Sequence, residues 1–170
     1  NEITFPGMGD RQAWTVFNYA KTTPASNVAW KGHSGDKVLI SFGAPYATTE
    51  NWLVSPELPG KAQTIAFWEK SFKGSDKETY NLMYSTSGFN RSDFTALEMN
   101  HIVSDKWTEV EYNLPEGTKY FAVVASSTDG FATLIDDISF IPDSCAAQQL
   151  TLVGYNIYRD GVKVNDTPVT

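Results

Sequence analysis

The amino-acid sequence predicts an all-β protein built as a two-sheet antiparallel sandwich or jelly roll. Short apolar or alternating runs recur along the 170 residues, and segments rich in glycine, proline, serine and asparagine separate them. Aromatic residues make up 14% of the chain, a share that suits strands. No window of ten or more residues has a convincing 3.6-residue period, so we expect almost no helix.

The expected strands follow one another at the spacing that sandwiches and jelly rolls show. They lie within 2–5, 12–18, 36–42, 51–56, 61–72, 78–87, 94–99 and 107–114, with two more inside 118–141. We expect 61–72 and 78–87 to form a hairpin, and the two strands inside 118–141 to be neighbours across the polar turn 126–130. The two longest loops are 21–35 and 43–50.

The last of these strands carries two successive carboxylates, Asp136 and Asp137, between Ile135 and Ile138. Successive side chains of a strand point to opposite faces, so one of the pair looks inward or towards a sheet rim. An ionised group there needs a partner or a cation. Two interpretations remain open: a rim carboxylate that caps backbone amides or pairs with a lysine, and a cation ligand.

The chain divides after Pro142. Residues 1–142 form the predicted sandwich, 143–149 read as a small polar linker, and 150–170 contain a hairpin with a type I′ turn at Asp160-Gly161. A lone hairpin is marginal in water, so we expect 150–170 to begin a further module of a longer protein. The linker holds Cys145, and a single cysteine allows no intrachain disulfide.

Composition excludes some partners. The formal net charge is −7, and lysine and arginine form no cluster, so nucleic acid is not expected as a partner. The chain has no apolar run of membrane-spanning length, and Asn1 opens no signal-peptide pattern. We therefore expect no membrane insertion.

No catalytic constellation is present in the sequence. His33 and His101 are the only imidazoles, both in polar, loop-like contexts, and no G-x-S-x-G or H-E-x-x-H pattern occurs. A carboxylate pair for glycoside hydrolysis is available in principle, but scattered glutamates in strands are more typical of solvated faces. These glutamates are Glu57, Glu69, Glu78, Glu98, Glu109 and Glu111. We expect a protein that is not an enzyme.

The tryptophans separate into core and surface candidates. Apolar neighbours place Trp14, Trp52 and Trp107 in the core. Trp68 shares one face of its strand with Lys70, whereas Ile65 and Phe67 occupy the core face. An exposed tryptophan can be a platform for a sugar ring or an anchor for a protein partner; the alternative is a plug for a loop or sheet edge. The candidate ligand-binding residues are Trp30, Lys31, His33, Tyr46 and Trp68.

Three blocks of the sequence carry a family resemblance. They are NWLVSPEL (51–58), YNLMYSTSGFNRSDFTAL (80–97) and WTEVEYNLPEGTKYFAVVASSTDGFATLIDDISF (107–140). In this order and spacing they resemble the cleaved adhesin domains of the gingipain and haemagglutinin family, which are secreted proteins of anaerobic Gram-negative bacteria. The YNIYRDGVKV tail is similar to the start of the fibronectin-III-like segment that often follows such a domain.

The resemblance implies a jelly-roll sandwich related to carbohydrate-binding and MAM-like modules, with structural calcium. In such modules a carboxylate of the DDI strand binds calcium together with groups near the first strand. Carried over to this sequence, the implied ligands are Asp136 or Asp137, with Glu2 as a weaker candidate. The chain departs from the family where 18–21 reads NYAK instead of a DxDGDG-like loop. Calcium takes six to eight oxygen ligands.

Two functional classes follow from the resemblance. One is an adhesin module of a secreted or surface-attached bacterial protein, which binds host protein or matrix ligands through its loops. The alternative is a carbohydrate-binding module attached to a larger enzyme, with a glycan as ligand. A line of exposed aromatic side chains on one sheet would separate the two classes, and Trp68 is the one reasonable candidate. We therefore favour the adhesin module.

Overall fold

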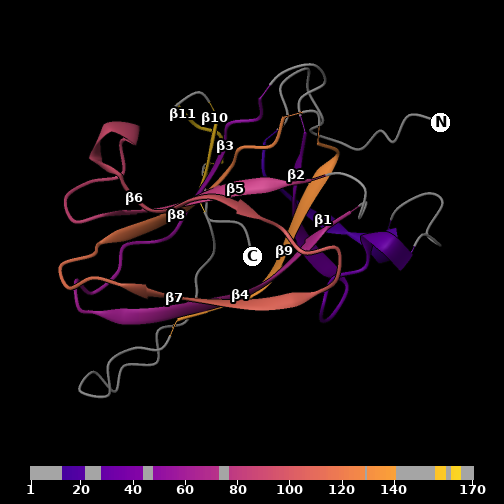
Figure 1. Cartoon of the computed structure of the whole chain (residues 1–170), viewed down its shortest axis with the longest axis horizontal. Helices are drawn as coiled ribbons and strands as arrows, with labels where there is room; N and C mark the ends of the chain where they lie inside the picture. Colours follow the sequence, from indigo (N-terminus) through magenta and orange to yellow (C-terminus); the bar gives the residue numbers. More distant parts are fainter. Residues whose placement is uncertain are drawn as a thin grey trace.

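The computed structural model describes residues 13–21, 28–43, 48–72, 77–128, 130–140, 156–159 and 162–165. Within these residues the chain forms two antiparallel sheets that face each other as a sandwich (Figure 1), and three short 3-10 helices but no α-helix. The 3-10 helices are η1 (Tyr19–Lys21), η2 (Val28–Trp30) and η3 (Arg91–Asp93). None of the helices in this part of the chain is long and apolar enough to span a membrane.

The order of the strands confirms the all-β jelly-roll prediction. One sheet has the order β1 (Thr15–Asn18), β2 (Lys37–Phe42), β9 (Ala132–Phe140), β4 (Gln63–Ser71) and β7 (Thr108–Leu114). The other has the order β11 (Val162–Lys163), β10 (Asn156–Arg159), β3 (Asn51–Val54), β8 (Tyr120–Ala125), β5 (Thr79–Ser85) and β6 (Thr95–Ile102). The strand predicted at 2–5 lies outside the described residues.

Two predicted neighbour relations are wrong. Strand β4 belongs to the five-stranded sheet and β5 to the six-stranded sheet, so 61–72 and 78–87 do not pair as a hairpin. Likewise β8 pairs with β3 and β5, whereas β9 pairs with β2 and β4. A polar turn can connect two strands of one sheet or two strands of opposite sheets. In both cases the apolar face of the second strand packs into the interior that the two sheets share, so the turn residues do not distinguish the two connections.

The main core lies between the two sheets. Alternation along β4 places Ile65 and Phe67 in this core and leaves Trp68 half-buried on the outer face, as the sequence predicts. Trp14 is also in the core, as predicted, and its indole N–H donates to the carbonyl oxygen of Asn51 at 2.9 Å. Inward-facing residues from both sheets thus form one continuous apolar layer.

A second apolar cluster, which includes Phe17, Phe42 and Leu134, covers the outer face of the five-stranded sheet around Trp30. The Trp30 side chain is only 4% exposed, and its ring stacks on that of Phe72 with centroids 3.8 Å apart. The sequence marks Trp30 as a candidate ligand contact and leaves open that it plugs its loop, but a side chain this buried offers no surface to a ligand. Trp30 instead plugs its loop onto the sheet, which is the alternative interpretation of a loop tryptophan.

The other two tryptophans predicted in the core are only half-buried. Trp52 lies on the outer face of the six-stranded sheet, edge-on to Phe94, and the guanidinium of Arg91 lies 5.5 Å from its ring centroid. Trp107 packs against the cluster around Trp30. Apolar neighbours in sequence do not distinguish the outer face of a sheet from the inner face, because a sandwich of this kind carries apolar clusters on both.

The C-terminal hairpin is part of the sandwich. Strand β10 pairs with β3 and with β11, and Ile157 is buried in the main core. The hairpin therefore gains a third strand and an apolar contact, which an isolated hairpin lacks. That residues 150–170 begin a further module stays a prediction, and the linker 143–149 with Cys145 lies outside the described residues.

Replacing Trp30 with alanine should lower the free energy of unfolding by about 3–5 kcal/mol, because it removes a buried indole from an aromatic cluster. The neighbouring exposed Lys31→Ala change should alter it by no more than about 0.5 kcal/mol. Urea denaturation of both variants measures the difference. Equal stabilities of the two variants would show that Trp30 does not hold the loop on the sheet.

Candidate functional site

The carboxylates of Asp136 and Asp137 on β9 hold the loop of residues 31–36 by three short contacts, and a fourth contact links the two aspartates. The Asp136 carboxylate accepts from the backbone N–H of Ser34 at 3.1 Å and from that of Asp137 at 2.9 Å. The Asp137 carboxylate accepts from the Ser34 hydroxyl at 2.6 Å and lies 2.8 Å from His33 Nδ1. We call Asp136 and Asp137 the carboxylate pair.

A bulge in β9 allows both carboxylates of the pair to contact the same loop. The β4–β9 register shifts between Ala66 and Trp68, which pair with Ser139 and Asp136, so β9 holds one extra residue here. Asp137 has a φ of 47°, in the left-handed region that aspartate enters more readily than most residues. The bulge breaks the strict alternation of a strand, and the two successive carboxylates therefore bind neighbouring residues of the same loop.

Gly32 lets the loop approach the carboxylate pair closely. A Cβ atom at this position would lie 2.6 Å from Asp136 Oδ2 and 2.7 Å from the carbonyl oxygen of Lys37. Both contacts are far shorter than side chains tolerate, so only glycine fits without a shift of the loop. The sequence alone does not single out Gly32, because one glycine in a loop rich in glycine and serine has no distinguishing pattern.

The two carboxylates differ in their affinity for protons. Burial raises the pKa of Asp136 above its ordinary value, although the backbone N–H groups of Ser34 and Asp137 oppose this. Burial acts in the same direction on Asp137, but the hydrogen bonds from Ser34 and His33 outweigh it and lower the pKa of Asp137. The pair therefore keeps at least one ionised member over a wide pH range, facing the loop.

The loop also brings His33 onto Trp68. The imidazole and indole rings stack with centroids 3.7 Å apart and an angle of 8° between their planes. Trp107 meets the imidazole edge-on at 6.0 Å, and the Lys70 ammonium lies 5.9 Å from the Trp107 ring centroid. We call these four residues the His33–Trp68 cluster; it presents aromatic and basic groups on the outer face of the five-stranded sheet.

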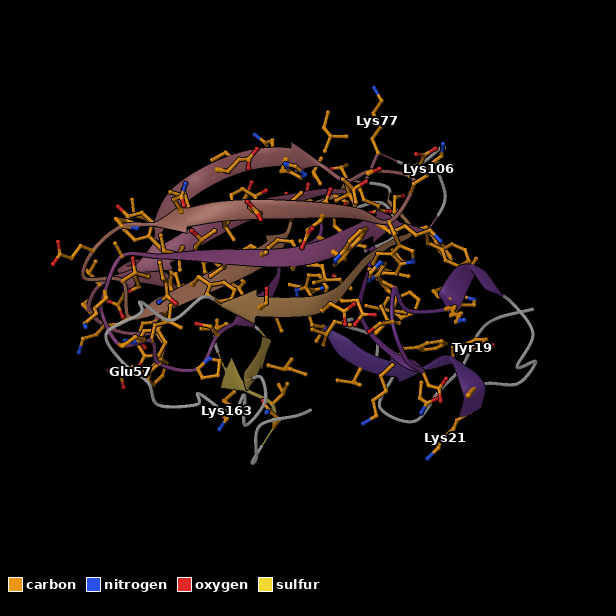
Figure 2. The ribbon with its side chains drawn as sticks, turned by 90° about the horizontal axis from the view of Figure 1, so that it is seen from below. Tyr19, Lys21, Glu57, Lys77, Lys106 and Lys163 are labelled. Carbon is orange, nitrogen blue, oxygen red and sulfur yellow. The ribbon has the colours of Figure 1, made fainter. Side chains whose placement is uncertain are left out.

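The structure unites two groups of residues that the sequence analysis kept apart. His33 and Trp68, predicted as ligand contacts, lie beside Asp136 and Asp137, predicted as metal ligands. Lys31 is exposed at the start of the same loop. Figure 2 shows Tyr19 and Lys21, just before this loop, at the end of the molecule opposite Glu57. The candidates Tyr46 and Glu2 lie outside the described residues.

Three residues of the site were not predicted as such: Ser34, Lys70 and Trp107. Lys70 had a signal, because it shares a strand face with Trp68. Trp107 was placed in the core on account of its apolar neighbours, and Ser34 stands in a loop where serine is common. Only the folded chain shows that Ser34 supplies two of the four contacts to the carboxylate pair.

The carboxylate pair would provide only part of the ligand set that calcium takes. Each of the four oxygens of the carboxylate pair already has one hydrogen-bonding partner within the protein, so a cation would use their remaining lone pairs. Two carboxylates provide at most four of the six to eight oxygens that calcium takes. No group of three or more histidine, cysteine, aspartate or glutamate side chains suited to a metal occurs in the described part of the chain.

Comparisons with known proteins give a consistent result. The sequence model of the Cleaved Adhesin Domain family matches residues 8–140. No curated protein sequence matches the chain significantly. The matched residues include the carboxylate pair, the loop of residues 31–36 and Trp68, so the candidate site lies entirely within the family domain.

Solved structures agree with this match. The K2 cleaved adhesin domain of Lys-gingipain superimposes with a TM-score of 0.67 at 24% identity, over 79% of this chain and 84% of that domain. The K1 domain of Lys-gingipain from Porphyromonas gingivalis W83 gives 0.64 at 25% identity, over 80% and 87%. A Clostridium thermocellum xylanase 10B structure with a CBM22-1 module gives 0.53 at 15% identity, over 83% of this chain and 26% of that one.

We propose from the resemblance that the carboxylate pair binds calcium, with further ligands outside the described residues. Calcium bound only to the folded state should raise the melting temperature, by the equivalent of about 2.7 kcal/mol at a hundred times the dissociation constant. Asp136→Asn should abolish the response, whereas Asp105→Asn, which removes an exposed loop carboxylate, should keep it. Differential scanning calorimetry with calcium or with chelator measures both; identical curves for the parent protein would reject the site.

Proposed function

Because the chain belongs to the cleaved adhesin domain family, we propose that it is a non-catalytic adhesin module that binds a host protein or matrix ligand through the His33–Trp68 cluster. The module would act outside the cell, in a secreted or surface-attached protein of a Gram-negative bacterium. The family membership supports the binding role, and the K1 domain of Porphyromonas gingivalis supports the bacterial setting.

The observation that carries this proposal is the anchoring of an exposed loop at fixed geometry. His33 is clamped between the Asp137 carboxylate and the Trp68 ring, and Ser34 is bonded to both members of the carboxylate pair. A loop held in this way loses little conformational entropy when it binds a partner. Loops at the end of a rigid sandwich are also where recognition usually resides.

The chemistry of the cluster suits a protein partner. His33 and Lys70 place basic groups beside two indole rings, and Lys31 is exposed at the start of the same loop. Tryptophan and basic side chains are enriched among the residues that dominate protein interfaces. The carboxylates of Glu109, Asp136 and Asp137 lie beside these groups, so the cluster offers a partner indole rings together with charges of both signs.

One observation favours the carbohydrate-binding alternative. Trp68 on β4 and Trp107, directly before β7, lie on the outer face of the five-stranded sheet, a pair of indoles on which sugar rings could stack. However, His33 covers one face of the Trp68 ring, and the Lys70 ammonium lies near the Trp107 ring. We therefore favour a protein ligand over a carbohydrate ligand.

Substitutions in the cluster test the proposal against immobilised haemoglobin, matrix proteins and a glycan array. His33→Ala and Trp68→Ala should each weaken binding to a protein ligand at least tenfold, about 1.4 kcal/mol, as expected for central contacts. Glu57→Ala, at the opposite end of the molecule (Figure 2), should bind like the parent protein. Surface plasmon resonance measures the affinities.

The outcomes separate the two ligand classes. Normal binding by both cluster variants would place recognition elsewhere on the module. If only glycans bind, and Trp68→Ala alone removes that binding, the carbohydrate-binding function replaces the adhesin function.

A further inference from the structure

A second histidine lies in a polar network that connects the two sheets at one edge of the sandwich. The network contains Glu69 of β4, Tyr80 of β5, Glu98 and His101 of β6, and Tyr112 of β7. Strands β6 and β7 are the outermost described strands of their sheets, so this network closes the sandwich on that side. We call it the cross-sheet network.

Glu69 is the buried centre of the cross-sheet network. It is 1% exposed, and one carboxylate oxygen accepts from the backbone N–H of Ser104 at 3.3 Å and lies 3.0 Å from His101 Nε2. Its other oxygen is buried and accepts no hydrogen bond from the described residues. The prediction of Glu69 on a solvated strand face is therefore wrong. A buried carboxylate requires a compensating charge.

The geometry around His101 fits the imidazolium form. Nε2 lies 3.0 Å from a Glu69 oxygen, and Nδ1 lies 3.1 Å from a Glu98 oxygen. Ionised carboxylates only accept hydrogen bonds, and a neutral imidazole has a single N–H, so it can donate to one of them alone. Two carboxylates at hydrogen-bond distance from both ring nitrogens are satisfied together only when both nitrogens carry a proton.

Tyr112 provides a partner for the neutral form. Its hydroxyl lies 3.4 Å from His101 Nδ1 and 2.7 Å from the Tyr80 hydroxyl. When His101 is neutral with its proton on Nε2, Nδ1 becomes a hydrogen-bond acceptor, and the Tyr112 hydroxyl can donate to it. The Glu98 carboxylate, which also only accepts hydrogen bonds, then has no donor on the imidazole. The Glu98 side chain is 40% exposed and can turn to water, whereas the Glu69 side chain is 2% exposed and cannot.

We propose that His101 is a proton-dependent latch: as an imidazolium it ties Glu69 of one sheet to Glu98 of the other, and on losing its proton it releases Glu98. The proton that leaves is the one on Nδ1, and it passes to solvent at the partly exposed edge. The contact between His101 and Glu69 remains in both states, so the sandwich stays closed while the tie to Glu98 opens.

The charges facing His101 determine the direction of the pH effect. Burial acts to lower the pKa of His101, but hydrogen bonds to Glu69 and Glu98 and their charges outweigh it and raise the pKa above 6.5. Burial and the neighbouring carboxylates raise the pKa values of Tyr80 and Tyr112, so both stay neutral hydroxyls. The latch therefore contributes its full stability below about pH 6.5 and loses it as the pH rises through the folded-state pKa of His101.

The latch acts on a strand that presents apolar groups to solvent. Strand β6 pairs only with β5 among the described strands, and three of its apolar side chains are exposed: Leu97, Met99 and Ile102. Glu98 is the residue between Leu97 and Met99. Because Glu98 and His101 both belong to β6, three residues apart, release of Glu98 removes a side-chain link within this strand. We therefore expect local opening of β6 to be more frequent at alkaline than at acidic pH.

Histidine NMR tests the proposal on the intact chain. The sequence has two histidines, so His33→Asn leaves His101 as the only imidazole. In this background both ring nitrogens should be protonated at pH 6, with a titration midpoint above 6.5. Glu98→Gln keeps an acceptor but removes the charge, so it should lower the midpoint. Glu109→Gln removes an equal charge from the exposed outer face of β7 and should leave the midpoint nearly unchanged.

Hydrogen exchange of the β6 amides reports the release itself. Exchange there should accelerate, beyond the intrinsic base-catalysed increase, as the pH rises through the His101 midpoint; in Glu98→Gln this step should be absent. A single neutral tautomer at pH 6, equal midpoint shifts in Glu98→Gln and Glu109→Gln, or no step in β6 exchange would each overturn the latch.

Discussion

The bulge at Asp137 is the constraint on which the outer face of the five-stranded sheet depends. A regular strand would direct the two carboxylates to opposite faces, and only one could reach the loop. With one extra residue in β9, both carboxylates bind the loop through Ser34 and His33. This anchoring places His33 on Trp68 and accompanies the burial of Trp30 in η2, directly before the loop. A local backbone irregularity thus determines how the candidate recognition surface is presented.

Both histidines contact carboxylates, but their surroundings give these contacts different roles. The side chains of His33 and Asp137 are each about a third exposed, so water screens their ion pair and it contributes little net stability. The contact instead positions the imidazole ring of His33. The pair of His101 and Glu69 is largely buried. Removing the imidazole there would leave an uncompensated charge, which is far more costly than losing an exposed pair. The exposed contact of His33 therefore positions a side chain, whereas the buried contact of His101 makes local stability depend on protonation.

Sequence periodicity predicted the strands and the inward residues of β4 well, because alternation is a local property. The same alternation that places Ile65 and Phe67 in the core also points Glu69 inward, yet its charge led us to expect solvent. The pairing of strands could not be predicted in this way. Turn residues do not specify whether the next strand joins the same sheet or the opposite one, and the bulge at Asp137 has no distinct sequence signal. The loop contacts depend on both.

The connections that cross between the sheets also bring together the residues of the candidate site. His33 and Asp137 are 104 positions apart in sequence, and Ser34 and Asp136 are 102 apart, so the loop is fixed by a strand formed much later in the chain. Bringing two distant parts of the chain together costs conformational entropy, and this cost grows only slowly with their separation in sequence. Burial of apolar side chains between the two sheets offsets this cost. Because the anchor requires Gly32, His33 and Ser34 from the loop, the other loop positions can vary without loss of the anchor. A sandwich of this type can therefore change its ligand while its strands and its anchor stay the same.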